Sequence, residues 1–317
     1  MTKNNTFLKD VNDGLSQTPK YISSHYFYDK VGDKLFQQIM EMPEYYLTNS
    51  ELEIFQEQSQ QIIASFDIDK NEEFELIELG AGDGKKTQHL LEKLLTDQFK
   101  FTYIPVDISM NSLSVITERM KSLFPILKIN PKQGDYFAVL DELFISDKPK
   151  VVLFIGSNLG NMDDETANNF LKKIAAHLKV GEKLLLGLDL IKSREIVLPA
   201  YNDSSGITRD FNFNLLKRIN EEMGANFNNA NFEHVPEYTE EEGVAKSFLK
   251  SRIKQTVYIK DLDKSFEFDE DECIQTEISR KYNDEILQMI IGDSGLIITS
   301  KLMDRKSYFA DYILSKL

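Results

Sequence analysis

The stretch FELIELGAGDGKK, residues 74–86, decides the fold of this chain. An apolar run at residues 75–79 is followed at once by Gly80, Gly82 and Gly84, and then by a segment with helical periodicity. Glycine adopts positive φ and carries no Cβ, so it suits places where backbone lies against a ligand. In open α/β sheets such ligands bind beyond the carboxyl ends of the strands. The stretch therefore predicts a strand, a cofactor-binding loop and a helix.

The spacing of the glycines narrows the choice of cofactor. The loop reads Gly-x-Gly-x-Gly, and Lys85 stands where a dinucleotide-binding loop has its third glycine. No Gly-Lys-Ser or Gly-Lys-Thr follows at the spacing of a P-loop. The pattern argues against a nicotinamide cofactor, and an oxidoreductase is kept only as a weaker alternative that titration with NAD would test.

Two acidic positions further along complete the cofactor prediction. Asp107 ends the next apolar run, 23 positions after Gly84, where a carboxylate can accept hydrogen bonds from both hydroxyls of a ribose. Asp135 and Tyr136 follow a glycine at the expected end of the third strand. They suit an adenine, with the carboxylate near the exocyclic amine and the ring beside the base. A nucleoside without a diphosphate indicates S-adenosyl-L-methionine.

The pattern along the chain predicts two domains. From residue 74 to residue 190, short apolar runs alternate with helical segments, which is typical of a parallel sheet with right-handed crossovers. Residues 12–66 are helical in pattern, and residues 191–280 change to polar and strand-like segments. Residues 283–317 return to α/β character, and we expect two of their segments to close the sheet as an antiparallel pair. The core domain is therefore expected to be split in sequence.

Composition argues against several classes of function. Lys plus Arg number 37 and Asp plus Glu 52, and the net charge of −15 repels nucleic acid and anionic lipid. No apolar run approaches the ~20 residues of a membrane span. Cys273 is the single cysteine and the four histidines are scattered, so neither a multi-thiolate nor a His-x-x-x-His metal site is expected. We expect a cytoplasmic monomer that binds a small amino-acid substrate and no metal, nucleic acid or membrane.

Further motifs extend over both expected domains. In chain order they are Phe-Tyr-Asp-x-x-Gly-x-x-Leu-Phe at 27–36, Pro-Glu-Tyr-Tyr at 43–46, Glu-Leu-Gly-x-Gly at 78–82, Phe-Ile-Gly-Ser-Asn-Leu-Gly-Asn at 154–161, Ala-Tyr-Asn-Asp at 200–203, Phe-Asn-x-Asn at 211–214 and Thr-Glu-Ile-Ser at 276–279. Together they resemble the histidine-specific Nα-methyltransferases of ergothioneine biosynthesis. The resemblance covers most of the chain.

The resemblance implies a fold and a reaction. The fold is an α/β, Rossmann-like class I methyltransferase sheet with a second substrate-binding domain, formed by the N-terminal helices and an insertion after strand 5. The substrate-binding domain would comprise residues 1–60 and 191–280, and the S-adenosylmethionine-binding domain residues 61–190 and 281–317. The implied reaction is trimethylation of the α-amine of L-histidine to its betaine, hercynine, by SN2 transfers from S-adenosyl-L-methionine.

The resemblance also implies the residues of the site. The predicted cofactor-binding residues are Gly80, Gly82, Lys86, Asp107, Asp135 and Tyr136. The predicted substrate-binding residues are Tyr28, Tyr45, Asn161, Tyr201, Glu277 and Ser279. Tyr28 is also the predicted catalytic residue, because its hydroxyl can orient the α-amine directly or through water.

The other implied substrate contacts each have a chemical reason. Glu277 and Ser279 lie two apart on an expected strand and so share a face, where carboxylate and hydroxyl can serve the two nitrogens of an imidazole. Asn161 and Tyr201 offer donors to the substrate carboxylate. Tyr45 offers a ring to pack over the imidazole.

One departure from the family pattern bears on the choice of substrate. Ser247 aligns with a position that is methionine in well-known histidine enzymes and that lies against the substrate ring. This difference keeps open a methyltransferase of the same fold for another amino acid or amine such as tryptophan. A separate alternative is a non-catalytic cofactor-binding protein. A panel of substrates tests the first, and cofactor binding without any turnover would indicate the second.

Overall fold

The computed structural model describes residues 3–317, with the side chains of all of these except residues 3–5 and 136–138. The chain divides into two units. Unit 1 comprises Met1–Tyr46 and Lys192–Arg280, and unit 2 comprises Leu47–Ile191 and Lys281–Leu317. Each unit is thus assembled from segments that are distant in sequence.

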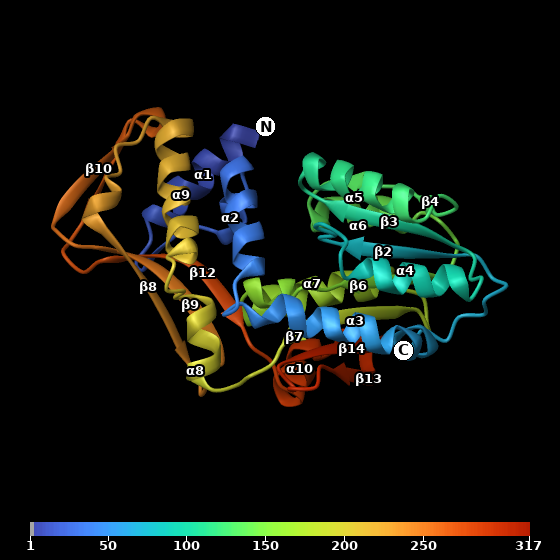
Figure 1. The fold of residues 1–317 in the computed structure, drawn as a ribbon. Helices are drawn as coiled ribbons and strands as arrows, with labels where there is room; N and C mark the ends of the chain where they lie inside the picture. Colours follow the sequence, from blue (N-terminus) through green and yellow to red (C-terminus); the bar gives the residue numbers. More distant parts are fainter. Residues whose placement is uncertain (1–2) are drawn as a thin grey trace. The chain divides into compact units, whose positions relative to one another are not determined.

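Unit 2 is built on an eight-stranded sheet. Its strands are β2 (Phe74–Leu79), β3 (Phe101–Asp107), β4 (Lys128–Ile129), β5 (Lys132–Gln133), β6 (Lys150–Phe154), β7 (Lys183–Asp189), β13 (Leu296–Met303) and β14 (Phe309–Lys316). The order is β13-β14-β7-β6-β2-β3-β4, with β5 also pairing with β3 (Figure 1). Strands β2, β3, β6 and β7 are parallel, and β14 runs antiparallel to both β7 and β13. The expected closing pair is confirmed, and the order reverses at β2, where cofactors of such sheets bind.

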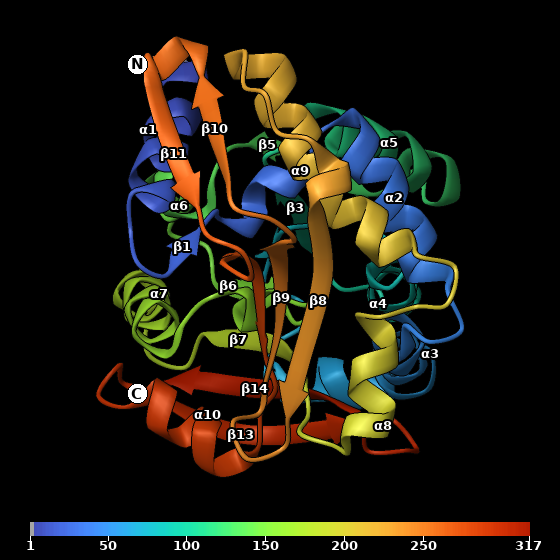
Figure 2. The same cartoon turned by 90° about the vertical axis from the view of Figure 1, so that its left-hand side faces the viewer.

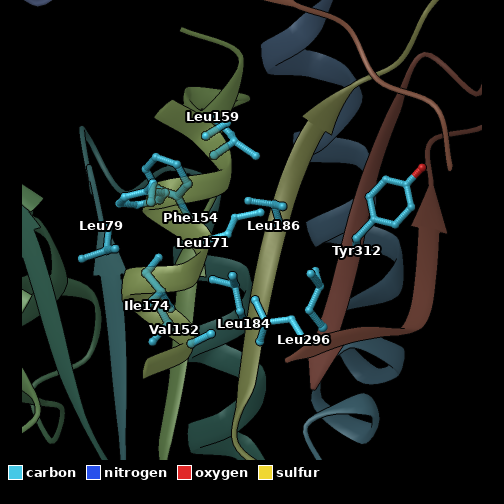
Figure 3. Close-up of a cluster of buried hydrophobic side chains, with 14 of the residues drawn as sticks. Leu79, Val152, Phe154, Leu159, Leu171, Ile174, Leu184, Leu186, Leu296 and Tyr312 are labelled. Atoms are coloured by element: carbon cyan, nitrogen blue, oxygen red, sulfur yellow. The ribbon is translucent and has the colours of Figure 1, made fainter. Parts of the chain in front are cut away.

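Helices cover both faces of this sheet. They are α3 (Tyr46–Ser65), α4 (Thr87–Thr96), α5 (Met110–Leu123), α6 (Tyr136–Leu143), α7 (Asp164–His177) and α10 (Asp284–Ile291), with the 3-10 helix η2 (Asn158–Asn161) after β6. In Figure 3, Leu79, Phe154 and Leu186 of the strands meet Leu171 and Ile174 of α7. Every residue of β7 is buried, because a parallel strand with helices on both faces has no solvated side.

The start of α3 corrects one predicted boundary. Residues 47–60 were expected in the substrate-binding domain, but they belong to unit 2. Ile54, Phe55 and Ile62 of α3 are fully buried in one hydrophobic cluster with Phe74 and Leu76 of β2. The helical pattern of this segment is real, and its apolar stripe packs on the parallel sheet.

Unit 1 combines helices with two smaller sheets. Its helices are α1 (Lys3–Leu15), η1 (Ser24–Phe27), α2 (Lys30–Glu41), α8 (Arg194–Val197), η3 (Leu198–Ala200), α9 (Ile207–Met223), η4 (Asn229–Asn231) and η5 (Lys260–Leu262). Its strands are β1 (Lys20–Tyr21), β8 (Phe232–Thr239), β9 (Val244–Ser251), β10 (Gln255–Ile259), β11 (Lys264–Phe268) and β12 (Cys273–Arg280). One sheet has the order β1-β12-β9-β8, and β10 and β11 form a separate antiparallel pair (Figure 2). Phe211, Leu215 and Ile219 of α9 share a core with Leu249 and Ile274 of the larger sheet.

Candidate functional site

The glycine loop follows β2 directly and presents two different surfaces. Gly80, Gly82 and Gly84 all have positive φ, at 75°, 55° and 67°. No described atom lies within 4 Å of the position that a Cβ would take at Gly82, so the backbone there is open to a ligand. At Gly84 a Cβ would lie 2.6 Å from the Met120 side chain and 2.7 Å from that of Ile116. Gly82 is thus suited to ligand contact, whereas Gly84 allows α5 to pack closely.

Asp107 stands beside this open backbone at the end of β3. Its Oδ2 accepts a hydrogen bond from the Gly82 N–H at 3.2 Å, and its Oδ1 accepts one from the Ser109 N–H at 2.8 Å. Burial raises the pKa of Asp107, and backbone N–H groups partly oppose that rise because they favour the ionised form. A carboxylate fixed by backbone next to an open glycine fits the ribose of S-adenosylmethionine.

The third predicted element lies at the neighbouring strand end. Gln133 of β5 pairs with Asp107, and the Gly134 N–H donates to the Asp107 carbonyl at 3.1 Å. Asp135 follows, exposed, immediately before α6. The backbone of Tyr136 opens α6, but its side chain lies outside the described residues. The expected order of the three strand ends is therefore observed.

Lys86 is held by a residue that the sequence did not suggest. Its ammonium forms an ion pair with Glu51 of α3, whose side chain is buried and whose Oε1 also accepts the Gly156 N–H at 2.8 Å. The sequence does carry one signal: Glu51 occupies an inward position of the helical stripe, with Leu47 and Ile54 one turn to either side. A charge at a core position predicts a buried partner but does not say which one.

Glu78, the last polar residue of β2 before the loop, has an unusual protonation equilibrium. Burial raises the pKa of its carboxyl to about 7, although Tyr103 and Thr87 donate hydrogen bonds that favour the ionised form. The Thr87 hydroxyl lies 2.7 Å from Oε1. The Glu78 carboxyl, two residues before Gly80, therefore titrates near neutral pH.

In unit 1, Glu277 and Ser279 lie on β12, opposite Ser247 and Ala245 of β9. The pairing register shifts between Gln275 and Glu277, which leaves Thr276 as an extra residue and re-aims the residues that follow. The Ser247 hydroxyl is fully buried and donates to Glu277 Oε2 at 3.1 Å. One face of β12 thus presents a carboxylate held by a serine, with a second hydroxyl two residues away.

A hydrogen bond to α9 holds Thr276, the extra residue at the register shift of β12. The Thr276 hydroxyl lies 2.6 Å from Asn212 Oδ1 on α9, and the Asn212 amide donates to the Thr208 carbonyl at 3.0 Å. Asn214, two residues on, donates to Asp29 Oδ1 at 3.0 Å. The Phe-Asn-x-Asn motif therefore positions the strand and the N-terminal segment.

The predicted aromatic substrate contacts, Tyr28, Tyr45 and Tyr201, also lie in unit 1. Tyr28 is 37% exposed, and its ring centroid lies 5.5 Å from that of Phe36. Phe36 lies 6.4 Å from Tyr45, which packs against a cluster containing Tyr201 and Ala245. Because Ala245 pairs with Ser279, these contacts connect Tyr28 to the polar face of β12.

Asn161 belongs to the other unit. It ends η2, directly after β6, and is exposed. The five remaining predicted substrate contacts lie in unit 1, so the predicted substrate residues are divided between the two units.

Comparison with known proteins establishes the family. The sequence profile of the family described as histidine-specific methyltransferase, S-adenosylmethionine-dependent, matches residues 7–316. The chain belongs to this family. It is therefore an S-adenosylmethionine-dependent methyltransferase, and its sheet is the Rossmann-like class I fold predicted from the sequence.

Two curated relatives and one solved structure illustrate the similarity. The methyltransferase is 33% identical over 288 residues to the histidine N-alpha-methyltransferase of Mycolicibacterium smegmatis, with 91% of this chain and 88% of the relative covered. It is 28% identical over 305 residues to ergothioneine biosynthesis protein 1 of Schizosaccharomyces pombe, with 93% and 39% covered. A crystal structure of an S-adenosylmethionine-dependent methyltransferase from Clostridium acetobutylicum is similar over 90% of this chain and 96% of that one, with a TM-score of 0.46 and 13% identity.

The described residues contain neither a candidate metal site nor a candidate membrane span. No group of three or more His, Cys, Asp or Glu side chains within residues 3–317, as far as they are described, is arranged to hold a metal ion. In the same part of the chain, no helix combines the length and the apolar character needed to cross a membrane.

Proposed function

We propose that this methyltransferase transfers methyl groups from S-adenosyl-L-methionine to the α-amine of L-histidine and forms the trimethylated betaine, hercynine, within ergothioneine biosynthesis. Unit 2 would hold the cofactor through the glycine loop, Asp107 and the Asp135 segment. Unit 1 would bind the amino acid. The names of the two curated relatives support this substrate and this pathway.

The polar face of β12 is the observation that carries the proposal. An imidazole has two ring nitrogens, and its recognition needs at least one acceptor together with a group that can donate or accept. Glu277 supplies the acceptor, and the buried Ser247 hydroxyl orients it at 3.1 Å. Ser279, two residues on, supplies the second group. An indole has one N–H and no ring acceptor, so it would leave one of these side chains unpaired.

The reaction requires positioning more than strong acid–base chemistry. When bound, the cofactor supplies a methyl group on a sulfonium. The Tyr28 hydroxyl accepts a hydrogen bond from the α-amine and keeps its lone pair aligned, since holding reactants in line is worth several orders of magnitude in rate. The ammonium of the free amino acid first loses a proton to water, which exposes the nitrogen lone pair. Each of the first two transfers then releases a further proton from nitrogen to water, so that three protons leave as three methyl groups are added. The faces of Tyr28 and Tyr45 stabilise the cation that accumulates as methyl groups are added.

A mass-shift assay tests the proposal directly. The protein is incubated with S-adenosylmethionine and one of a panel of amino acids, including tryptophan, and we expect three added methyl groups on histidine. Turnover of tryptophan in preference to histidine would replace the proposed substrate. Binding of the cofactor without turnover of any member would contradict catalysis.

Glu277→Ala tests how the ring is recognised. An imidazole N–H left unpaired in a buried site costs about 1–3 kcal/mol, so the histidine dissociation constant should rise roughly ten- to a hundredfold in calorimetry. Glu233→Ala is the matched control, because Glu233 is an exposed carboxylate on β8 of the same sheet. An unchanged constant for Glu277→Ala would mean that the ring is not bound there.

We also propose that the protein acts as a cytoplasmic monomer that binds no nucleic acid. The net charge of −15 supports the last point, because it repels phosphate backbones. Light scattering coupled to size exclusion would measure the mass, and a dimer would contradict the monomer.

A further inference from the structure

A second acidic side chain, that of Asp311, lies near Glu51 inside unit 2. Asp311 is on β14, where it pairs with Gly187 of β7 on one side and Leu302 of β13 on the other. It is fully buried, and neither of its carboxyl oxygens accepts a hydrogen bond from a donor among the residues that the structure describes. A buried carboxyl without a partner requires an explanation, because an ionised one is costly to bury.

Gly187 shows where the two carboxyls meet. A Cβ built on Gly187 would lie 2.0 Å from Glu51 Oε1 and 3.0 Å from Asp311 Oδ1. Both oxygens therefore approach the small space that this glycine leaves in the middle of a buried strand. Glycine inside a strand often marks such a close approach.

The charges around Asp311 favour its neutral form. The titratable groups that act on it are Glu51 of α3 and Lys86, just ahead of α4, whereas its strand neighbours Gly187 and Leu302 carry no titratable side chain. The Lys86 ammonium is shared among three carboxyls, those of Glu51, Glu78 and Asp311, and it already forms an ion pair with Glu51. Burial first, and the Glu51 charge second, raise the pKa of Asp311 well above its ordinary value.

Glu51 connects two loops that follow adjacent strands. Through Lys86 it holds the end of the glycine loop after β2, and through the Gly156 N–H, at 2.8 Å and 3.0 Å, it holds the loop after β6. Lys86 Nζ lies 3.4 Å from the position that a Cβ on Gly156 would take, so the ammonium also lies close to this second loop. The carboxyl ends of β2 and β6 are where this fold binds its cofactor.

The geometry points to a proton-bearing carboxyl pair as the positioning element of the cofactor loops: Asp311 keeps its proton and donates it in a hydrogen bond to Glu51, and the Glu51 carboxylate holds Lys86 and Gly156 in place. Asp311 and Glu51 are positioning residues, since they act on the cofactor through these two loops.

Conservative substitutions distinguish the role of Asp311 from that of Glu51. An amide at position 311 would keep a neutral donor, so Asp311→Asn should bind S-adenosylhomocysteine within about twofold of the wild type in calorimetry. Glu51→Gln removes the negative charge that pairs with Lys86 and leaves one oxygen for two donors, so its NH₂ lies against either the Lys86 ammonium or the Gly156 N–H; binding should weaken at least about tenfold. Tyr312→Phe is the matched control, because Tyr312 is the next residue of β14 and packs in the hydrophobic cluster on the other face of the sheet; its affinity should not change.

Infrared spectroscopy detects the proposed proton on Asp311 directly, which a purely structural role of this residue would not require. At pH 8.5, above the pKa of Glu78, we expect a carboxylic-acid C=O band in the wild type and its loss in Asp311→Asn. The inference is overturned if that band is missing, if Asp311→Asn binds as weakly as Glu51→Gln, or if Glu51→Gln binds normally. Should Glu51→Gln fail to fold, the band and the Asp311→Asn affinity still decide the matter. Because no amino-acid substrate is needed, the outcome is independent of the proposed histidine activity.

Discussion

Glu78→Gln should remove a loss of stability that the wild type suffers as pH rises. The Glu78 side chain is 1% exposed, and its pKa is raised from 4.5 to about 7. The native state therefore binds this proton more tightly than the unfolded chain, so unfolding becomes easier as pH rises through this interval. Each pKa unit corresponds to about 1.4 kcal/mol, which makes the full effect about 3 kcal/mol, with about 2.5 kcal/mol of it between pH 5 and pH 8.

Urea unfolding at a series of pH values measures this effect. The difference in unfolding free energy between Glu78→Gln and the wild type should shift by about 2.5 kcal/mol in favour of the variant from pH 5 to pH 8. Taking the difference cancels the other titrating groups. Tyr103→Phe removes a donor to the ionised form and should move the wild-type titration to higher pH, since Tyr103 donates to Glu78.

Glu92→Gln, a change of an exposed glutamate on α4, is the matched control and should follow the wild type at every pH. A parallel pH dependence of Glu78→Gln and the wild type would refute the reasoning. It would mean that Glu78 is ionised throughout and that the Thr87 and Tyr103 hydrogen bonds outweigh its burial.

The remaining predictions concern three other sites. Gly187→Ala should destabilise unit 2 by about 1–3 kcal/mol and weaken S-adenosylhomocysteine binding, because the new Cβ would lie 2.0 Å from Glu51 Oε1. Unchanged denaturation and binding would mean that Glu51 does not crowd this position. Tyr28→Phe should keep the cofactor affinity and lower kcat roughly tenfold, and an unaltered kcat would remove the orienting role. Burial lowers the pKa of His234 to about 4, so the protein loses stability as pH falls from 6.5 toward 4. His234→Leu should avoid about 3 kcal/mol of that loss, and acid unfolding identical to that of the wild type would contradict this prediction.

Most of the fold was predictable from local patterns. The apolar run that ends at Asp107 forms β3. The helical segment that follows begins at Met110 because the Ser109 hydroxyl accepts the Ser112 N–H at 3.2 Å. The boundary at residue 60 was wrong, since a helical pattern shows that a stripe is buried but not which sheet buries it.

The candidate site was predictable where chemistry follows the chain closely. Gly82 and Asp107 lie at the ends of neighbouring parallel strands, so their 3.2 Å contact follows once the strand order is known. The Ser247–Glu277 hydrogen bond did not follow, because it depends on the register of β9 against β12 and on a shift in that register. A one-residue slip would turn either side chain to the opposite face.

The sequence by itself determined which segments are strands and helices, where the cofactor loop lies and which family the chain resembles, because periodicity and glycine spacing act over a few residues. Only the tertiary structure decided the partners of the buried charges. Glu51 accepts a hydrogen bond from Gly156 across 105 positions of sequence, and Asp311 and Glu51 both approach a glycine on a third segment. The cost of burying a charge depends on which groups the fold brings within a few ångströms, and separation along the chain does not reveal them.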